Sequence, residues 1–248
     1  MAASVKHSNE TNEQYTPIDI IERARKVMGS IDTDPATSEL ANSRVQAPYI
    51  FTRDDGERTF EEHWHGNVFL NPPGGRDLVL TGTGLNSNPA IFWAKLMHAW
   101  HKERTARMGI VIGFTIEVLQ SSQGVEKYPM LRFPLCIPAK RLAFDVPREE
   151  KIRQLQDRLL SDKIKDNKRK LLEKKIAQLE GSDEQIVTGE DPPHGNVIVC
   201  VPPIEEHMFG VAVPWDQPDE PERPWVGWTG PVVRKFQDVF SEIGYVRI

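Results

Sequence analysis

The residues whose types and spacing best suit chemistry are Asn71, Pro72 and Pro73, which follow a short apolar run. Asn71 offers an amide oxygen as a hydrogen-bond acceptor, and Pro72 offers a main-chain carbonyl. Neither proline has an N–H group that could compete for these acceptors. A turn of this kind suits an incoming amino group that must give up two hydrogen bonds.

The element that would position this turn is a strand over residues 66–70. Val68, Phe69 and Leu70 carry no charge, as a strand covered on both faces requires. The two prolines then end the strand, because neither can donate to a sheet ladder. Ligands of open α/β sheets bind at the carboxyl ends of strands, so we expect the turn to lie at a binding edge.

Several short motifs resemble, in order and spacing, those of the Dam-type adenine-specific DNA methyltransferases carried by bacteriophages and prophages. The resemblance covers most of residues 13–145 and 191–201. Its motifs are Glu13-Gln14-Tyr15-Thr16-Pro17, Asp32-Thr33-Asp34-Pro35-Ala36-Thr37, Asn42, Asp54-Asp55-Gly56, Trp64-His65-Gly66, Asn71-Pro72-Pro73, Lys140-Arg141-Leu142-Ala143-Phe144 and Pro192-Pro193-His194-Gly195-Asn196-Val197-Ile198-Val199. The chain departs from the family at Gly74, where a tyrosine or phenylalanine normally stacks on the flipped base.

This resemblance implies a Rossmann-like, doubly wound α/β fold of the type that uses S-adenosylmethionine. The implied reaction flips an adenine out of double-stranded DNA and transfers a methyl group in line to its exocyclic amino group. Asn71, Pro72 and Pro73 would then be the catalytic residues, and no metal ion would be needed. In the family, the aromatic residue at position 74 completes the base pocket, so Phe69, Trp93 or the loop over 76–88 would replace it here.

The resemblance also implies a set of residues that hold the cofactor. They are Tyr15, Thr16, Pro17, Asp34, Pro35, Ala36 and Asp55. Each segment has a simpler local interpretation as well. Thr16 and Pro17 make a good helix start, Asp34 before a proline is a common turn opener, and Asp54-Asp55-Gly56 is compatible with a type I turn.

Two other functions remain open at this stage. A protein-glutamine methyltransferase uses the same Asn-Pro-Pro arrangement on a planar amide, although the rest of the chain does not follow that family. The other alternative is a catalytically impaired relative, in which glycine at position 74 reflects a lost ability to hold the flipped base. Such a protein would serve in nucleic-acid binding or assembly.

The remaining elements follow from apolar periodicity and from helix start and stop signals. Trp93, Leu96, Met97 and Trp100 recur at helical spacing after Asn88 and Pro89, which predicts a core stripe on a helix capped by Asn88. Strands that alternate with helices indicate a doubly wound sheet. Helices are expected over 18–28, through Asn42, from 89 to about 100 and from 231 to 243, and strands over 30–34, 108–114, 131–137, 195–201 and 245–248.

Composition excludes several function classes. The formal net charge of −5 leaves nucleic-acid contact to local patches. The two cysteines, Cys136 and Cys200, lack C-x-x-C spacing, which disfavours a zinc site or disulfide framework and favours a reducing cytoplasm. The resemblance implies that this is the cytoplasm of a bacterial or phage-infected host cell. No apolar run approaches the ~18 residues of a membrane span, and no signal peptide is evident. Thr81-Gly82-Thr83-Gly84 lacks the lysine of a phosphate loop.

The chain is expected to form a disordered lead over 1–12 and one methyltransferase domain over 13–248, with a stiff proline-rich loop over 214–224. A helical insert over about 149–181 interrupts the domain, with ten Lys or Arg and seven Asp or Glu between Glu149 and Glu180. The pattern does not decide between one long helix and a hairpin that breaks near Asp166-Asn167. The insert is either a solvated arm, a dimerisation arm that mediates self-association, or a prong that contacts DNA.

Overall fold

A computed structural model describes residues 14–76, 87–113, 116–125, 128–160, 165–189, 195–206 and 228–248. Within these residues the chain divides into two compact units. The larger unit comprises Ile18–Leu142 and Pro193–Ile248, and the smaller one comprises Met1–Pro17 and Ala143–Pro192. The leading residues 1–12, the centre of the loop over 76–88 and the proline-rich loop over 214–224 lie outside the described residues.

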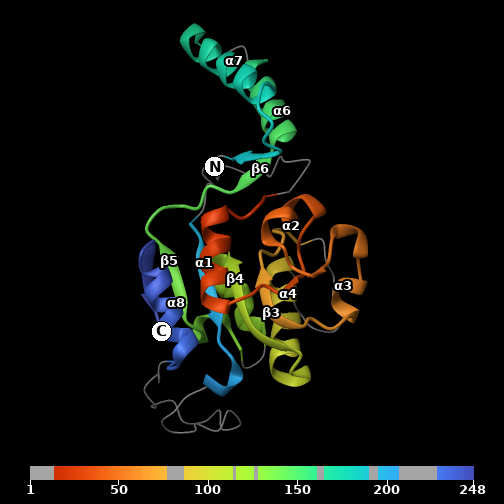
Figure 1. The fold of residues 1–248 in the computed structure, drawn as a ribbon, viewed down its shortest axis with the longest axis vertical. Helices are drawn as coiled ribbons and strands as arrows, with labels where there is room; N and C mark the ends of the chain where they lie inside the picture. The colour runs from red at the N-terminus through yellow and green to blue at the C-terminus, as the bar shows by residue number, and fades with distance from the viewer. Residues whose placement is uncertain are drawn as a thin grey trace, which may run out of the picture. The chain divides into compact units, whose positions relative to one another are not determined.

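The larger unit is built on a seven-stranded mixed sheet with the strand order β2-β1-β3-β4-β8-β5-β9 (Figure 1). The strands β2, β1, β3 and β4 are parallel neighbours, whereas β8 runs antiparallel to both β4 and β5, and β9 runs antiparallel to β5. The α/β class is therefore confirmed. The strands are β1 (Thr33–Asp34), β2 (Tyr49–Ile50), β3 (Gly66–Leu70), β4 (Ala106–Gly113), β5 (Leu135–Pro138), β8 (Val197–Val201) and β9 (Gly244–Arg247).

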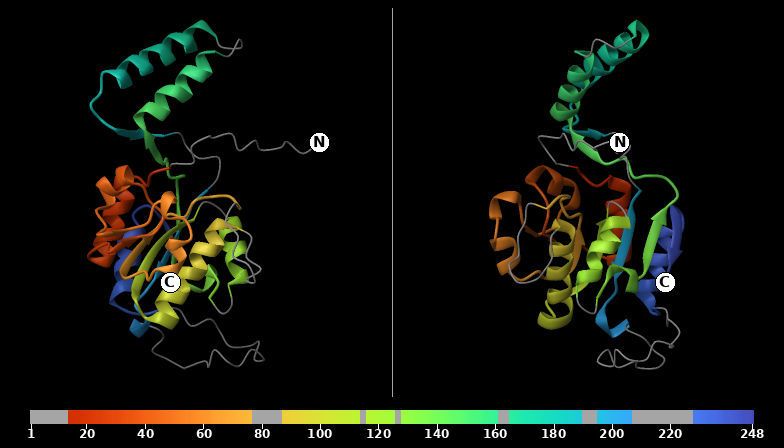
Figure 2. Two further views of the ribbon diagram at one scale, coloured as in Figure 1. Left: turned by 90° about the vertical axis from the view of Figure 1, so that its right-hand side faces the viewer. Right: turned by 180° about the vertical axis from the view of Figure 1, so that it is seen from behind.

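Helices cover both faces of this sheet, with α1 and α8 side by side on one face and α4 on the other (Figures 1 and 2). Side chains alternate along each strand, so Val68 and Leu70 of β3 join the core under α4 while Phe69 points to the opposite face. The stripe of Trp93, Leu96, Met97 and Trp100 is buried in that core, as the sequence predicted. The helices are α1 (Ile18–Met28), α2 (Glu39–Val45), α3 (Arg58–Glu61), α4 (Asn88–Met97), α5 (Ile116–Ser121) and α8 (Pro231–Phe240).

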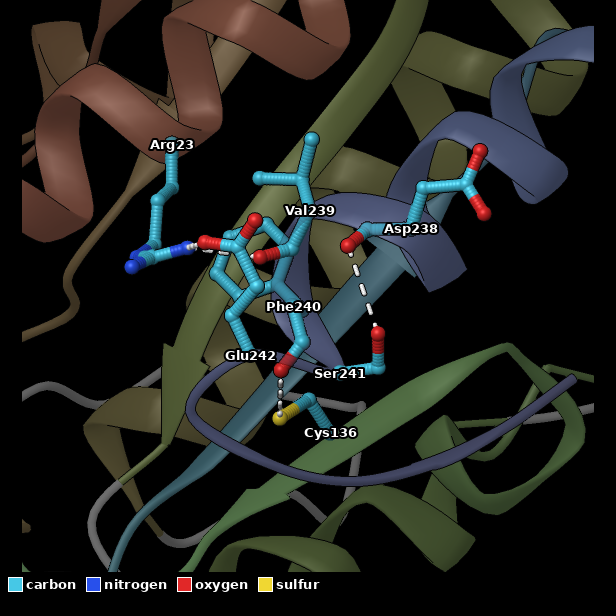
Figure 3. Close-up of polar contacts among 7 residues, drawn as sticks. All are labelled: Arg23, Cys136, Asp238, Val239, Phe240, Ser241 and Glu242. Atoms are coloured by element: carbon cyan, nitrogen blue, oxygen red, sulfur yellow. Dashed lines mark hydrogen bonds and ion pairs between the residues drawn. The ribbon is translucent and has the colours of Figure 1, made fainter.

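The packing of α8 explains how the far edge of the sheet is held (Figure 3). Arg23 of α1 donates from Nη1 to the Val239 carbonyl at 2.7 Å and forms an ion pair with Glu242, also at 2.7 Å. The Cys136 thiol of β5 donates to the Phe240 carbonyl at 3.6 Å. Burial raises the pKa of Cys136 to about 11, so this free, buried cysteine acts as a core residue and not as a nucleophile.

Several boundaries differ from those expected. The first strand is confined to Thr33–Asp34, because Asn67 draws the Ser30 carbonyl into a hydrogen bond of 3.2 Å instead of leaving it for a ladder. The strand expected over 131–137 begins only at Leu135, since residues 130–132 form a 3-10 turn. After α4 the chain continues as a π-helix over His98–Glu103, a rare irregularity that apolar periodicity does not reveal.

The smaller unit is a helical hairpin carried on a short two-stranded ribbon. Helix α6 (Arg148–Leu159) and helix α7 (Asp166–Glu180) pack around Leu155, Leu172 and Ile176. Strands β6 (Asp145–Pro147) and β7 (Ile186–Thr188) pair antiparallel at its base, which Figure 2 shows. The insert is thus a hairpin and not one long helix, although the ribbon was not foreseen.

No helix in the described part of the chain has the length and apolar character that crossing a membrane requires.

Candidate functional site

The sheet of the larger unit has a point at which its connections change direction. From β1 the chain crosses to β2 on one side, whereas from β3 it crosses to β4 on the other side. Since β1 and β3 are parallel neighbours, their carboxyl ends meet at one edge of the sheet and their loops diverge there. In open α/β sheets this switch point is where a crevice for ligands forms.

The structure places two of the sequence-derived segments at this edge. Thr33 is paired with Val68, so Asp34 ends β1 one residue beyond that pair and Asn71 follows β3 three residues beyond it. Pro35 and Ala36 continue from Asp34, and Pro72 and Pro73 continue from Asn71. The structure thus brings these two predicted segments to one edge of the sheet, and their functional roles stay predictions.

The residues of the turn after β3 differ in their exposure to solvent. Pro72 is buried, whereas Asn71 is half-buried and Pro73 is exposed. The Oδ1 atom of Asn71 is shielded from solvent. Water competes less with a substrate for a shielded amide oxygen than for an exposed one. A hydrogen bond to the shielded oxygen is also stronger, because the local dielectric is low.

Asn88 secures the other end of this turn, and sequence reasoning missed its role. Its Nδ2 donates to the Gly74 carbonyl at 2.9 Å, and its backbone N–H donates to the Gly75 carbonyl at 3.0 Å. We expected Asn88 to cap α4, but Ser87 occupies the N-cap position and Asn88 is the first helical residue. Its side chain is 1% exposed, so a polar residue beside Pro89 inside an apolar helix was the only available signal.

Gly74 itself has open surroundings. A Cβ atom built at this position meets no heavy atom of the described residues within 4 Å, and its backbone is not in the left-handed region. The glycine at position 74 is therefore not required by the conformation of the described turn. Gly66, at the amino end of β3, is the opposite case. Its φ is +65°, and a Cβ atom would lie 2.3 Å from Asp32 Oδ2.

Asp34 is a buried carboxyl group whose side chain is held within its own loop. Its Oδ1 accepts a hydrogen bond from the Ala36 N–H at 3.3 Å, and the side chain also bonds with Thr37. Burial raises the pKa of Asp34 from 3.8 to about 7, against the lowering effect of these hydrogen bonds. A carboxyl group that is only partly ionised at neutral pH gains charge when a cation binds beside it.

Asp55 has a local role in the structure. Its Oδ2 accepts hydrogen bonds from the Thr52 N–H at 2.7 Å and the Thr52 hydroxyl at 3.1 Å, which forms a capping box on the 3-10 helix over Arg53–Asp55. These hydrogen bonds lower the pKa of Asp55. The carboxylate therefore has a structural explanation that requires no cofactor.

Tyr15, Thr16 and Pro17 belong to the smaller unit, where Tyr15 extends the ribbon. The Tyr15 N–H donates to the Asp145 carbonyl at 2.7 Å, and the Asp145 N–H donates back at 2.8 Å. Tyr15 and Thr16 are buried, and Pro17 is half-buried. Their expected contact with a cofactor stays a prediction.

Among the described residues, no three His, Cys, Asp or Glu side chains form a group that could hold a metal ion. Comparisons with protein-family models, curated proteins and solved structures found no match to this chain.

Proposed function

We propose that this chain is an S-adenosylmethionine-dependent methyltransferase that acts on the exocyclic amino group of adenine in DNA. One observation carries the proposal. The Asn71-Pro72 turn follows β3 at the switch point of the sheet, beside the buried acid that ends β1. The motif resemblance supplies the identity of the reaction, and the topology supports it by joining two of its motifs at one edge.

The donor set at this edge fits a cationic cofactor. S-adenosylmethionine carries a positively charged sulfonium and supplies a methyl group to a nucleophile. Asp34 is 3% exposed, and its pKa near 7 leaves a carboxylate that a nearby cation would favour. Pro35 and Ala36 are the other proposed cofactor-binding residues of this edge, and the cofactor contact expected of Tyr15, Thr16 and Pro17 stays a prediction.

The catalytic task of the turn is to prepare a poor nucleophile. The lone pair of the adenine amino nitrogen is delocalised into the ring, so the group is planar and weakly basic. Asn71 Oδ1 and the Pro72 carbonyl would accept its two hydrogens, which favours a pyramidal nitrogen with its lone pair directed at the methyl donor. Both acceptors lie in the turn that directly follows the buried strand β3.

The base must leave the duplex first, which costs a few kcal/mol. Stacking on an aromatic side chain normally offsets part of this cost, and Gly74 offers none. Phe69 points to the other face of the sheet and Trp93 is packed in the core, so neither is placed to stack on a base in this structure. Residues of the 76–88 loop are left as the proposed clamp.

Two measurements test the proposal on the full chain. Calorimetry should detect binding of S-adenosylmethionine, and transfer of a labelled methyl group to unmethylated double-stranded DNA should yield N6-methyladenine after digestion. Pre-methylated DNA is the matched control and should accept no label. Cofactor binding without transfer to any DNA would contradict the proposed reaction.

A second candidate function is a non-catalytic relative that binds nucleic acid or serves assembly. The observation that favours it is Gly74, which is exposed and has no described residue near the place where the family has a stacking ring. The same pair of measurements separates the two candidates. A scaffold would bind DNA, with or without cofactor, and would leave the adenines unmethylated.

A further inference from the structure

Helix α7 of the smaller unit carries its charges on two separate sides. At about 100° per residue, one arc of ~160° holds every lysine of the helix and no acidic residue. The residues of this arc, called the lysine side below, are Asn167, Lys168, Lys170, Leu171, Lys174, Lys175 and Gln178. The acidic residues are Asp166, Glu173 and Glu180, which recur at seven-residue steps along one line.

The third side of α7 is apolar and is already occupied. Leu172 and Ile176 are buried against Leu155 of α6, and Arg169 donates to the Leu159 carbonyl at 3.4 Å. The lysine side is therefore turned toward solvent, and all of its residues are exposed. The hairpin core holds the lysines on a fixed helical surface.

The lysines of this side have no ionic partners within the described residues. None of Lys168, Lys170, Lys174 and Lys175 forms an ion pair there, although acids lie elsewhere on the same helix. On α6, by contrast, Arg153 pairs with Glu150. Lys170 and Lys174 are like charges at i, i+4 spacing, an arrangement that slightly destabilises a helix and that a bound anion would relieve.

We propose that the lysine side of α7 binds the phosphate backbone of duplex DNA, an inference that rests on the proposed DNA substrate. The segment between Glu149 and Glu180 holds ten basic and seven acidic residues, whereas the whole chain has a formal net charge of −5. The hairpin is thus a basic surface on an otherwise acidic protein. Lysine ammonium groups act as point charges toward phosphates and read no base sequence.

Two other occupants fit this surface less well. A membrane-bound amphipathic helix needs an exposed apolar face, but the apolar side of α7 is packed on α6 and the lysine side offers only Leu171, 53% exposed. A second copy of α7 docked through the same side would bring lysines against lysines. Duplex DNA supplies the complementary charge.

The test compares two full-length variants that each remove four positive charges. The first replaces Lys168, Lys170, Lys174 and Lys175 with glutamine, a residue that keeps helix propensity. The matched control replaces the exposed residues Lys26, Lys102, Arg107 and Lys235 of the larger unit with glutamine. Affinity for a duplex of about 30 base pairs is measured by fluorescence anisotropy across a range of salt concentrations.

Each lost phosphate contact lowers the slope of log affinity against log salt by about 0.9, so the slope of the α7 variant should fall by about 2 to 4. Its affinity near 0.1 M salt should drop at least tenfold, while cofactor affinity and the maximal transfer rate at saturating DNA stay unchanged. The control variant should keep most of the original slope.

An α7 variant that retains the original slope while still methylating DNA would overturn this inference and leave the proposed function intact. Equal losses in both variants would also overturn it, because bulk charge and not this surface would then govern binding. If the original protein binds duplex DNA with the expected slope but transfers no methyl group, the lysine side is supported and the proposed reaction fails.

Discussion

At the scale of single residues, the amide of Asn71 bears the proposed chemistry. Asn71→Ala should leave S-adenosylmethionine affinity unchanged, because the amide addresses the substrate nitrogen, and should slow transfer by roughly 10²- to 10³-fold, as removal of one oxyanion-hole contact does. Asn71→Asp keeps the acceptor position and should retain part of the activity. Transfer is measured at saturating cofactor and DNA, and full methylation by Asn71→Ala would remove the turn from the mechanism.

Asp34 should show a conflict between stability and binding. Its folded pKa is raised to about 7 from 3.8, so between those values the folded state binds more protons than the unfolded state and the free energy of unfolding falls as pH rises. Over this pH range the free energy of unfolding falls by ~4 kcal/mol at most, at about 1.4 kcal/mol per pKa unit. Asp34→Asn should remove it, which makes the variant about 2 to 4 kcal/mol more stable than the original protein at pH 8 and nearly equal at pH 4.

The same substitution should weaken S-adenosylmethionine binding, because the amide cannot ionise beside the sulfonium. In the original protein, affinity should rise with pH through 7 and binding should release a proton below it, whereas in Asp34→Asn both effects should vanish. Denaturant unfolding at pH 8 and pH 4 measures the change in stability. Calorimetry in two buffers of different ionisation enthalpy measures the cofactor affinity and the proton release. Unchanged cofactor affinity would show that Asp34 lies outside the cofactor site.

Gly74 offers a gain-of-function test, since the structure leaves room for a side chain there. If position 74 faces the flipped base, Gly74→Tyr should tighten DNA binding by up to the ~1 to 3 kcal/mol that base stacking contributes. Gly74→Leu is a control of similar bulk without a ring. Tighter binding by Tyr alone supports a vacant clamp, whereas a fall in activity for both variants shows that another residue already occupies this space.

Some roles of these residues can be predicted from the neighbouring sequence, whereas others depend on contacts that only the folded chain makes. Asn71 was singled out because an uncharged run followed by two prolines marks the end of its strand, and Asp34 because an acidic residue stands before a proline at the end of a predicted strand. Asp55 shares the acidic character of a cofactor ligand, but its capping box with Thr52 depends on backbone geometry that the tripeptide does not specify. Asn88 was misassigned because its partner, the Gly74 carbonyl, lies 14 residues away across a loop.

At the scale of elements, α4 fixes the turn that follows β3. Asn88→Ala removes the hydrogen bond to Gly74 and should cost about 1 to 3 kcal/mol of stability, as an unsatisfied buried group does. It should also reduce methyl transfer more than cofactor affinity, because the Asn71-Pro72 acceptors lose their support. The matched control is Asn67→Ala, which breaks buried hydrogen bonds to Met28 and Ser30 at the amino end of β3. Equal transfer by both variants, after correction for stability, would contradict a positioning role for Asn88.

Elements with strong periodicity were predictable from sequence, and those created by tertiary pairing were not. Helix α1 ends at Met28, before Gly29 with φ +89°. Strands β3 and β8 fall inside the runs expected to form them, whereas β4 begins two residues before the uncharged run expected over 108–114 and includes Arg107. The ribbon of β6 and β7 had no such signal. Its three-residue strands lie 38 residues apart in the sequence and pair only because the hairpin between them brings Pro147 opposite Ile186.

At the scale of the whole molecule, this ribbon provides a way to remove the hairpin without disturbing the larger unit. The Arg148 N–H donates to the Gln185 carbonyl at 2.8 Å, so residues 149–184 leave and return at adjacent positions. Replacing them with Asn-Gly closes Arg148 to Gln185 by a two-residue type I′ turn. Among the described residues, Leu155, Leu172 and Ile176 form a cluster separate from the core of the sheet, so we expect that core to survive loss of the hairpin.

The shortened protein should therefore unfold at nearly the same temperature as the full chain and should bind S-adenosylmethionine with the same affinity. Its affinity for duplex DNA should become less salt-dependent, by at least as much as in the four-lysine variant, because the deletion removes those four ammonium groups together with the other basic residues of the hairpin. A control protein with an eight-residue Gly-Ser bridge in place of Asn-Gly separates loss of the hairpin from strain in the turn. A separate unit with its own apolar cluster can be removed at the small entropic cost of closing one short loop. Loss of the folded state in both proteins would therefore show that the hairpin belongs to the core of the molecule.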